Sequence, residues 1–297
     1  MRAIGTNLLS FQPREFKHIT HGAEREETGK HKAYCLCCIG KRGVGKSTTA
    51  ANLALALSAQ GFAVGLLDAD IYGPSLPVVM GIAAGTRPEI RDKRLMVPLR
   101  AHGIECNSMG FLVDERTAMV WRAPMVVSAF TQILTDTAWS ALDYLIIDMP
   151  PGTGDIQLSL AQTVAVRGAV IVTTPQDIAL SDARKGIEMF KKVGVPVLGV
   201  VENMSVHTCS NCGHAEAIFG SGGGERLAQD YGVDVIGRLP LDINIREQTD
   251  RGVPVVASSQ YPNLQEAYAE LARGVHAQAL AHEAHANAAP TISVADD

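Results

Sequence analysis

The sequence predicts an α/β fold, in which a mostly parallel, twisted sheet carries helices on both faces. Two observations support this fold class. Short apolar runs rich in Val, Ile and Leu alternate along the chain with helical stretches, which is typical of parallel strands buried on both faces. In addition, 46% of the 297 residues are hydrophobic but only 5% are aromatic, which favours tightly packed helices on a sheet over a β-sandwich.

The expected elements follow one another in a regular order from residue 34. A strand at 34–39 leads into a glycine loop and a helix over 46–60. Further strands are expected at 62–67, 104–109, 145–147, 169–174, 197–201 and 233–237. Helices lie between most of them, for example 178–193 and 223–231, and a last helix over 264–285 packs against the sheet. The chemistry of such a fold gathers where the parallel strands end.

A single domain over residues 34–285 is the simplest account of the length. Two domains would follow from about 150 residues per domain, but one α/β domain can reach about 250. Residues 1–33 are polar and without periodicity, so we expect a flexible leader, and we expect a disordered tail over 286–297. No apolar run reaches about 18 residues, which excludes a membrane-spanning helix. We also expect no membrane among the partners.

Charge and cysteine content narrow the functional classes. The net charge is −5, and Lys and Arg form no basic stripe, so nucleic acid is not expected as a partner. The six cysteines are too unevenly spaced in too long a chain for a disulfide scaffold. We therefore expect a reducing compartment, the cytoplasm or alternatively an organellar matrix, with thiols that are free or bound to metal.

The strongest local pattern is GKRGVGKST at residues 40–48, directly after one expected strand and directly before a helix. It matches the phosphate-binding pattern G-x-x-x-x-G-K-[ST], in which backbone N–H groups and a helix N-terminus surround phosphate oxygens. Lys46 is expected to reach the β- and γ-phosphates, and Ser47 to bind Mg²⁺. The expected nucleotide contacts from this loop are Gly40, Lys41, Gly43, Val44, Gly45, Lys46, Ser47 and Thr48.

Carboxylates at the ends of two expected strands support a nucleotide site. Asp148 ends an apolar strand, the position at which an acid holds Mg²⁺ in P-loop NTPases. Asp68 and Asp70 end the strand that follows the phosphate-loop helix, which in a parallel sheet places them beside the phosphates. Taken singly, each of these acids could instead be a helix cap or a turn residue.

The chain resembles the deviant Walker-A ATPases, a group that includes the MinD/ParA-type positioning ATPases. Within that group it resembles the Mrp/ApbC iron–sulfur cluster carriers. Lys41 carries the first resemblance, because an extra lysine after the first glycine is typical of the group. Residues 33–275 carry the second, in the segments LDADIYGPS at 67–75, SMGF at 108–111, WRAPM at 121–125, DMPPGTGD at 148–155, TPQD at 174–177, ENMS at 202–205 and IFG at 218–220.

The resemblance implies a role for several residues. Asp70 would position the attacking water, and together with Lys41 and Lys46 it forms the expected catalytic set. Asp68 would help to hold the Mg²⁺ shell beside Ser47 and Asp148. Asn203 would contact adenine, and Pro240, Leu241 and Asp242 would lie over the base. Lys41 would reach across a dimer to the nucleotide of the partner, and Arg42, where the family has Gly, could crowd that dimer face.

Cys209 and Cys212 form a lone C-x-x-C in a polar loop over 206–217. A structural zinc site needs four ligands, and His207 and His214 from the same loop could complete one. Alternatively, a two-fold dimer brings two identical thiol pairs together and so supplies four thiolates for a bridging 4Fe–4S cluster, the arrangement that the resemblance also implies. The four remaining cysteines, in expected strands, are read as core: Cys35, Cys37, Cys38 and Cys106.

The sequence therefore predicts a homodimeric, ATP-hydrolysing iron–sulfur cluster carrier that uses ATP, Mg²⁺ and a transient 4Fe–4S cluster and passes the cluster to apo iron–sulfur proteins. One alternative is a MinD/ParA-type positioning ATPase, but residues 276–297 contain no Lys or Arg for a basic membrane-binding helix. The other is an ATPase with a structural zinc site in the loop at 207–214. A nitrogenase-like reductase would draw its cluster cysteines from two separate loops, which a C-x-x-C argues against.

Overall fold

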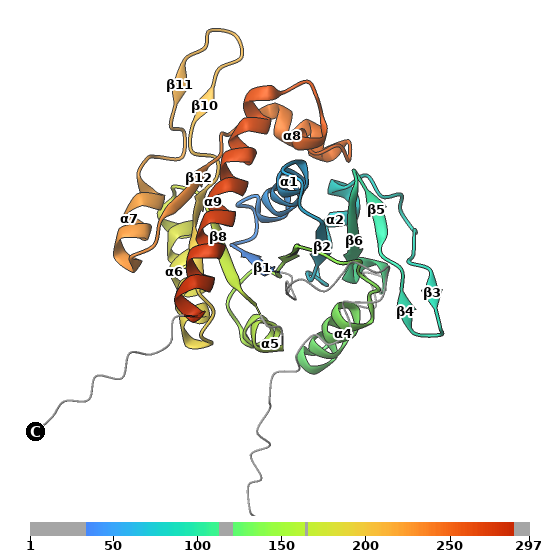
Figure 1. Ribbon diagram of the computed structural model, residues 1–297. Coiled ribbons are helices and arrows are strands. Elements are labelled where there is room, and N and C mark those ends of the chain that lie inside the picture. Colours follow the sequence, from blue (N-terminus) through green and yellow to red (C-terminus); the bar gives the residue numbers. More distant parts are fainter. Residues whose placement is uncertain (1–33, 113–120, 164–165, 288–297) are drawn as a thin grey trace, which may run out of the picture.

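The central sheet has the predicted parallel architecture. The computed structural model describes residues 34–112, 121–163 and 166–287, and within them eight strands pair in the order β12-β9-β8-β1-β7-β2-β6-β5 (Figure 1). All neighbours pair in parallel except the edge strand β5, which runs antiparallel to β6. The strands are β1 (Tyr34–Ile39), β2 (Val64–Asp68), β5 (Leu99–Ala101), β6 (Ile104–Ser108), β7 (Tyr144–Asp148), β8 (Gly168–Thr173), β9 (Val197–Glu202) and β12 (Val235–Arg238).

Helices cover both faces of this sheet, as the alternating pattern predicts. On one face lie α1 (Lys46–Ala59) and α9 (Pro262–Asn287), which pack against each other. The other face is covered by α4 (Ala123–Asp136), α5 (Asp155–Thr163), α6 (Asp177–Lys192) and α7 (Gly223–Tyr231). The short elements are α2 (Leu76–Val79), α8 (Ile243–Asp250) and the 3₁₀ turns η1 (Met109–Phe111) and η2 (Val255–Ala257).

Alternating side chains of the strands feed two separate cores. In β1, Leu36 and Cys38 belong to the core under α1 and α9, whereas Ile39 belongs to the core under α4 to α7. Strands β2, β7, β8 and β9 are buried along their whole length. Burial on both faces explains why these strands read as continuous apolar runs rather than as alternating ones.

Three short pairings differ from the sequence expectation. An antiparallel β3 (Ile90–Arg91) and β4 (Leu95–Met96) hairpin and the edge strand β5 were not predicted. The expected polar loop over 206–217 contains a hairpin, β10 (His207–Thr208) with β11 (Ala215–Glu216), which projects from the body (Figure 1). Strands of two or three residues are too short to show a period in the sequence.

The ends of the chain leave part of the domain prediction open. Helix α9 continues to Asn287, so the first two residues of the expected tail are helical. Residues 1–33 and 288–297 lie outside the described part of the chain, and the leader and the rest of the tail stay predictions. Among the described residues, no helix is both long enough and apolar enough to cross a membrane.

Candidate nucleotide site and cysteine arm

The phosphate loop joins the end of β1 to the start of α1, as the pattern predicts. Gly45 is the N-cap of α1 and has a left-handed φ of 82°. A side chain there would be strained, and its Cβ would lie 2.3 Å from Nδ2 of Asn203. The first N–H groups of α1 have no partner within the helix, so the loop presents donors and a partial positive charge to an anion.

A buried ion pair lies beside this loop. Nζ of Lys46 contacts Oδ1 of Asp148, with only 6% and 2% of the two side chains exposed. Nζ also lies 3.4 Å from Oγ of Ser47. The other carboxylate oxygen of Asp148, Oδ2, is buried without a hydrogen-bond partner. A buried, unpaired carboxylate oxygen near a serine hydroxyl fits the oxygen ligands that Mg²⁺ prefers, so the residues present suit the ion.

Asp68 is fully buried at the end of β2, and its oxygens are already engaged. Oδ1 accepts a bond from the Asp70 N–H at 2.9 Å. Oδ2 accepts from the N–H groups of Ser75 and Leu76 at 3.1 Å and from the Ser108 hydroxyl at 3.2 Å. Burial, and then the charge of Asp148, raises the pKa of Asp68 to about 7. These bonds hold the segment 68–76 in place, while a role of Asp68 in the Mg²⁺ shell stays a prediction.

Asp70 lies at the same end of the sheet. Its Oδ1 accepts bonds from the N–H groups of Tyr72 and Gly73, each at 3.2 Å. Burial raises the pKa of Asp70, and the nearby charges of Lys46 and Arg42 oppose that rise. The structure thus brings Asp70 close to the phosphate-loop cations, as its expected position requires.

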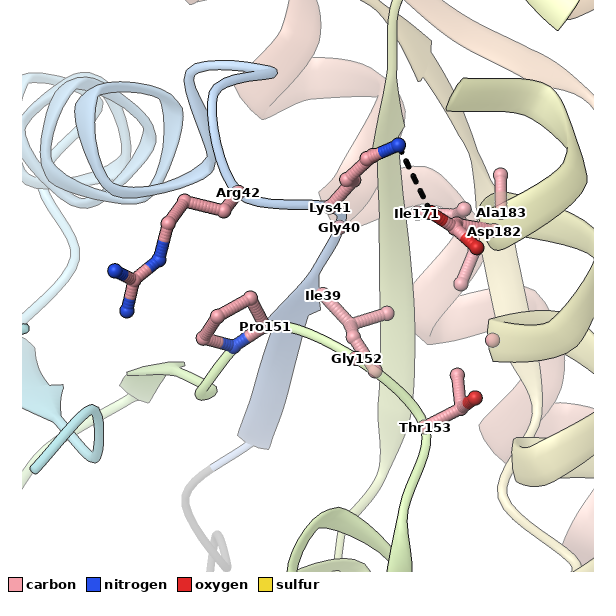
Figure 2. Close-up of a pocket in the computed structure, with 11 residues that line it drawn as sticks. Ile39, Gly40, Lys41, Arg42, Pro151, Gly152, Thr153, Ile171, Asp182 and Ala183 are labelled. Atoms are coloured by element: carbon pink, nitrogen blue, oxygen red, sulfur yellow. Dashed lines mark ion pairs between the residues drawn. The ribbon is translucent and has the colours of Figure 1, made fainter. Parts of the chain in front are cut away.

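The two unusual side chains of the loop point in opposite directions (Figure 2). Nζ of Lys41 lies 3.4 Å from Oδ2 of Asp182 on α6, and about a third of each side chain is exposed. Arg42 lies instead towards Gly73, and a Cβ at Gly73 would come within 3.2 Å of its Nη2. Lys41 is therefore held within its own chain here. A cavity of about 240 Å³ lies between the loop, residues 151–153 and α6.

The expected adenine contacts lie at one edge of the phosphate loop. Nδ2 of Asn203 donates to the carbonyl of Val44 at 2.8 Å, and the Asn203 N–H donates to Thr173 at 2.7 Å. The chain before Pro240 runs beside the segment that contains Asn203, since the Leu239 N–H donates to the backbone carbonyl of Glu202 at 3.0 Å. Asp242 caps α8 by accepting from the Asn244 N–H at 2.7 Å.

The C-x-x-C pair lies at the tip of the β10–β11 hairpin, which we call the cysteine arm (residues 206–217). The Gly213 N–H donates to the backbone carbonyl of Cys209, and the Cys209 N–H donates to the backbone carbonyl of His214, each at 2.9 Å. Cys212 is exposed and Cys209 is half-buried. The backbone N–H groups of Cys212 and Asn211 lower the pKa of the Cys209 thiol, which favours its thiolate form, the form that binds metals.

The histidines of the arm do not complete a zinc site. In the described part of the chain, no three or more His, Cys, Asp or Glu side chains come close enough together to hold a metal ion. His207 instead turns Nδ1 towards the Leu241 carbonyl oxygen, 3.0 Å away. The four-ligand arrangement weighed from the sequence is therefore not assembled within one chain.

Of the four other cysteines, the structure describes the side chains of two. Cys38 and Cys106 are fully buried, as predicted, and burial raises the pKa of each thiol to about 12. The side chains of Cys35 and Cys37 lie outside the described residues, so their core assignment stays a prediction.

Sequence reasoning did not find two partners of the site. Asp182 binds Lys41 across 141 positions of the chain, and Ser108 binds Asp68 across 40. The segment containing Ser108 is part of the family resemblance, which gives a signal for that residue. Asp182 lies in the first turns of α6 and carries no local signal, because its partner is set only by the packing of α6 beside the loop.

Comparison with known proteins places the chain among iron-transfer NTPases. The ParA family model, described as NUBPL iron-transfer P-loop NTPase, matches residues 30–276. An iron-sulfur cluster carrier protein of Pseudomonas fragi is 65% identical over 233 residues, covering 78% of this chain and 81% of that protein. An iron-sulfur cluster carrier protein of Escherichia coli K12 is 59% identical over 80% of this chain, which spans 64% of that protein's length. The mouse iron-sulfur cluster transfer protein NUBPL is 55% identical, over 80% of this chain and 74% of its own.

Solved structures agree with the fold. A nucleotide-binding protein of Archaeoglobus fulgidus, in complex with ADP, is 37% identical with a TM-score of 0.65, covering 74% of this chain and 86% of that one. The cell division ATPase MinD of Pyrococcus furiosus has a TM-score of 0.64 over 83% of this chain and 99% of its own. At 22% identity, the likeness to MinD supports the fold alone.

Proposed function

The chain belongs to the family of NUBPL iron-transfer P-loop NTPases, and on that premise we propose that it is an ATP-hydrolysing carrier of 4Fe–4S clusters, which it passes to apo iron–sulfur proteins. The names of its relatives from Pseudomonas fragi and Escherichia coli support the carrier activity. We place the protein in the cytoplasm, where free thiols persist, and expect neither nucleic acid nor membrane as its partner.

The nucleotide half of this function rests on the loop at residues 40–48. Lys46 and the N–H groups at the start of α1 would hold the phosphates, and Ser47, Asp148 and Asp68 would hold Mg²⁺. When bound, Mg²⁺ neutralises charge on the β- and γ-phosphates. Asp70 orients the attacking water, while Asn203, Pro240 and Asp242 border the base. Positioning of this kind supplies most of the catalysis in phosphoryl transfer.

The single observation that carries the cargo assignment is the thiol pair on the cysteine arm. Cys209 and Cys212 are held by a short turn away from both cores, and no third ligand joins them among the residues that the structure describes. Two thiolates make half of a 4Fe–4S site. A second copy of the chain, related by a two-fold axis, would supply the other half, and a cluster shared between protomers can be released when they shift.

The dimer also gives Lys41 its proposed role. In one chain Lys41 rests on Asp182. We propose that it leaves Asp182 when two protomers meet and reaches the nucleotide of the partner. Arg42 lies on the side of Gly73 and Asp70, where its guanidinium is clear of the Lys41 side chain (Figure 2).

Anaerobic reconstitution with iron and sulfide tests the proposal. The wild-type protein should become a dimer that gains charge-transfer absorbance at about 400 nm, where thiolate-bound clusters absorb. The Cys209→Ala/Cys212→Ala variant should stay colourless, with nucleotide binding intact. A suitable control is Cys106→Ala, which removes a buried thiol that takes no part in the site.

The same preparation distinguishes the zinc alternative. A monomer that holds one zinc ion per chain, and gains no visible absorbance on reconstitution, would exclude the carrier function. Transfer is then measured by incubating the loaded dimer with an apo 4Fe–4S enzyme and following the recovery of that enzyme's activity.

A further inference from the structure

One stretch of chain, residues 203–207, connects the phosphate loop to the cysteine arm. Asn203 begins it, and its side chain donates to the Val44 carbonyl inside the loop. The arm begins only three residues later, at Val206, and the first thiol is that of Cys209. We call residues 203–207 the connector.

The nucleotide end of the connector is tightly held. Asn203 is 7% exposed, and its Nδ2 lies so close to Gly45 that a Cβ there would come within 2.3 Å. The side chain of Met204 reaches towards the same glycine, since its Cε would lie 3.8 Å from that Cβ. A change in the loop backbone when phosphates bind must therefore move, or be resisted by, the first two residues of the connector.

The arm end of the connector is paired with the chain over the expected base site. The N–H and hydroxyl of Ser205 both donate to the Leu239 carbonyl at 3.0 Å. The Leu241 N–H donates to the Val206 carbonyl at 2.9 Å. His207 returns a bond from Nδ1 to the Leu241 carbonyl at 3.0 Å, and a carbonyl can only accept, so Nδ1 carries the proton. The root of the arm thus rests on residues 239–241, which border the expected base site.

Met204 lies between these two ends in an unusual backbone conformation. Its φ is +56°, in the left-handed region that is unfavourable for a residue with a Cβ. The other described non-glycine residues with positive φ are Asp92, Lys93 and His102, which occupy turns of surface hairpins. Met204 lies in a turn as well, but this turn follows the end of β9 beside the phosphate loop and does not join a surface hairpin. A left-handed non-glycine residue persists only where its surroundings hold it, and such strain is found at active sites and in segments that switch.

We propose that Met204 is a positioning residue, the joint through which occupancy of the nucleotide site sets the orientation of the cysteine arm. The inference rests on the proposed function, of which it names the regulation. Binding of nucleotide displaces Asn203 and the base segment together, and the connector, which is hydrogen-bonded to Leu239 and Leu241, transmits that displacement to Cys209. No new contact between nucleotide and cysteines is required.

Thiol alkylation of the cluster-free protein tests this joint. The rate of iodoacetamide reaction at Cys209 and Cys212 is measured by peptide mass spectrometry, with and without Mg²⁺ and a non-hydrolysable ATP analogue. In the wild type we expect the analogue to change the rate about fivefold or more, the lower range of allosteric coupling. Met204→Gly should bring the ratio of the two rates close to one, because glycine frees the joint.

The matched control is Lys93→Gly. Lys93 also has a left-handed φ, of 60°, but it lies in the turn between β3 and β4. This variant should keep the wild-type ratio of rates, and both variants should bind the analogue. A Met204→Gly protein that binds the analogue and still shows the full ratio would overturn the inference.

A second measurement does not depend on the variant being folded. In the wild type, hydrogen exchange of the Ser205 and Leu241 amides, which donate across the connector, should change when the analogue binds. Unchanged exchange at both amides, with the analogue bound, would also overturn the inference. Failure of the proposed function is distinct, because it appears as a protein that gains no cluster on reconstitution while the alkylation ratio is still measured.

Discussion

At the scale of single residues, the buried ion pair between Lys46 and Asp148 is the feature of the site whose loss should cost the most stability. Removing one partner of a buried pair costs about 3–5 kcal/mol, because it leaves a charge without compensation. We expect Lys46→Met to lower the free energy of unfolding of the nucleotide-free protein by that amount. Adding Asp148→Asn removes the stranded charge and should restore most of the loss. Urea denaturation followed by circular dichroism measures both.

The comparison of these two variants contains its own control. Neither binds nucleotide in the proposed manner, so any difference in their stability arises from the buried charge alone. If the single and the double variant unfold at the same urea concentration, the pair does not account for the loss.

The thiols give a second residue-scale prediction, this time in pH. Backbone N–H groups lower the pKa of Cys209, whereas burial raises the pKa of Cys38 and Cys106 to about 12. A lowered pKa keeps the reactive thiolate populated to lower pH. Iodoacetamide should therefore label Cys209 in the folded protein below the pH at which an ordinary thiol stops reacting, while Cys38 and Cys106 stay unlabelled.

Unfolding the protein in urea supplies the reference for this experiment. There, all three thiols should react with the ordinary pH profile, because the N–H donors and the burial are both lost. Equal profiles for Cys209 in the folded and unfolded protein would contradict the lowered pKa.

At the scale of elements, helix α6 supplies Asp182, which pairs with Lys41 within the chain and would compete with the proposed contact of Lys41 with a partner's nucleotide. The Lys41–Asp182 pair is partly exposed and so is worth no more than about 1 kcal/mol. Asp182→Asn removes this competing contact. Dimerisation would break two such pairs, one in each protomer, so we expect the dissociation constant of the ATP-bound dimer to fall by about two- to thirtyfold, as measured by analytical ultracentrifugation.

An ion pair that joins α6 to α7 gives the control for that variant. Arg184 of α6 contacts Asp230 of α7 at 3.1 Å, also at the surface but away from the loop. Asp230→Asn should leave dimerisation unchanged. If Asp182→Asn weakens the dimer instead, Asp182 contributes to the dimer contact rather than competing with it.

The helices and strands also show which features of this fold could be predicted from the sequence and which could not. The parallel strands could be predicted because strands buried on both faces have continuous apolar sequences. The phosphate loop could be predicted because its glycines and lysine are close together in the chain. The cysteine arm was predicted as a loop, since β10 and β11 are two residues each. The contact of Lys41 with Asp182 depends on how α6 packs beside the loop, and no local pattern encodes it.

At the scale of the whole molecule, the proposed cargo site lies outside the two cores that hold the chain together. Both hydrophobic cores lie against the sheet, and neither includes a residue of the arm at 206–217. From Thr208 to Glu216 the side chains are exposed except for half-buried Cys209. Folding and nucleotide binding should therefore not depend on the tip of the arm.

Replacing residues 209–214 by Asn-Gly tests this separation. Thr208 and Ala215 are paired across the hairpin, so a two-residue turn of the type that Asn-Gly favours can join them without disturbing β10 or β11. We expect an unchanged melting temperature, and the same stabilisation by saturating Mg²⁺ and ATP analogue, about 2.7 kcal/mol at one hundred times the dissociation constant. Reconstitution with iron and sulfide should give no cluster. A variant that melts earlier, or that loses stabilisation by the analogue, would show that the tip supports the ATPase body, and the cargo site would then not be separable from it.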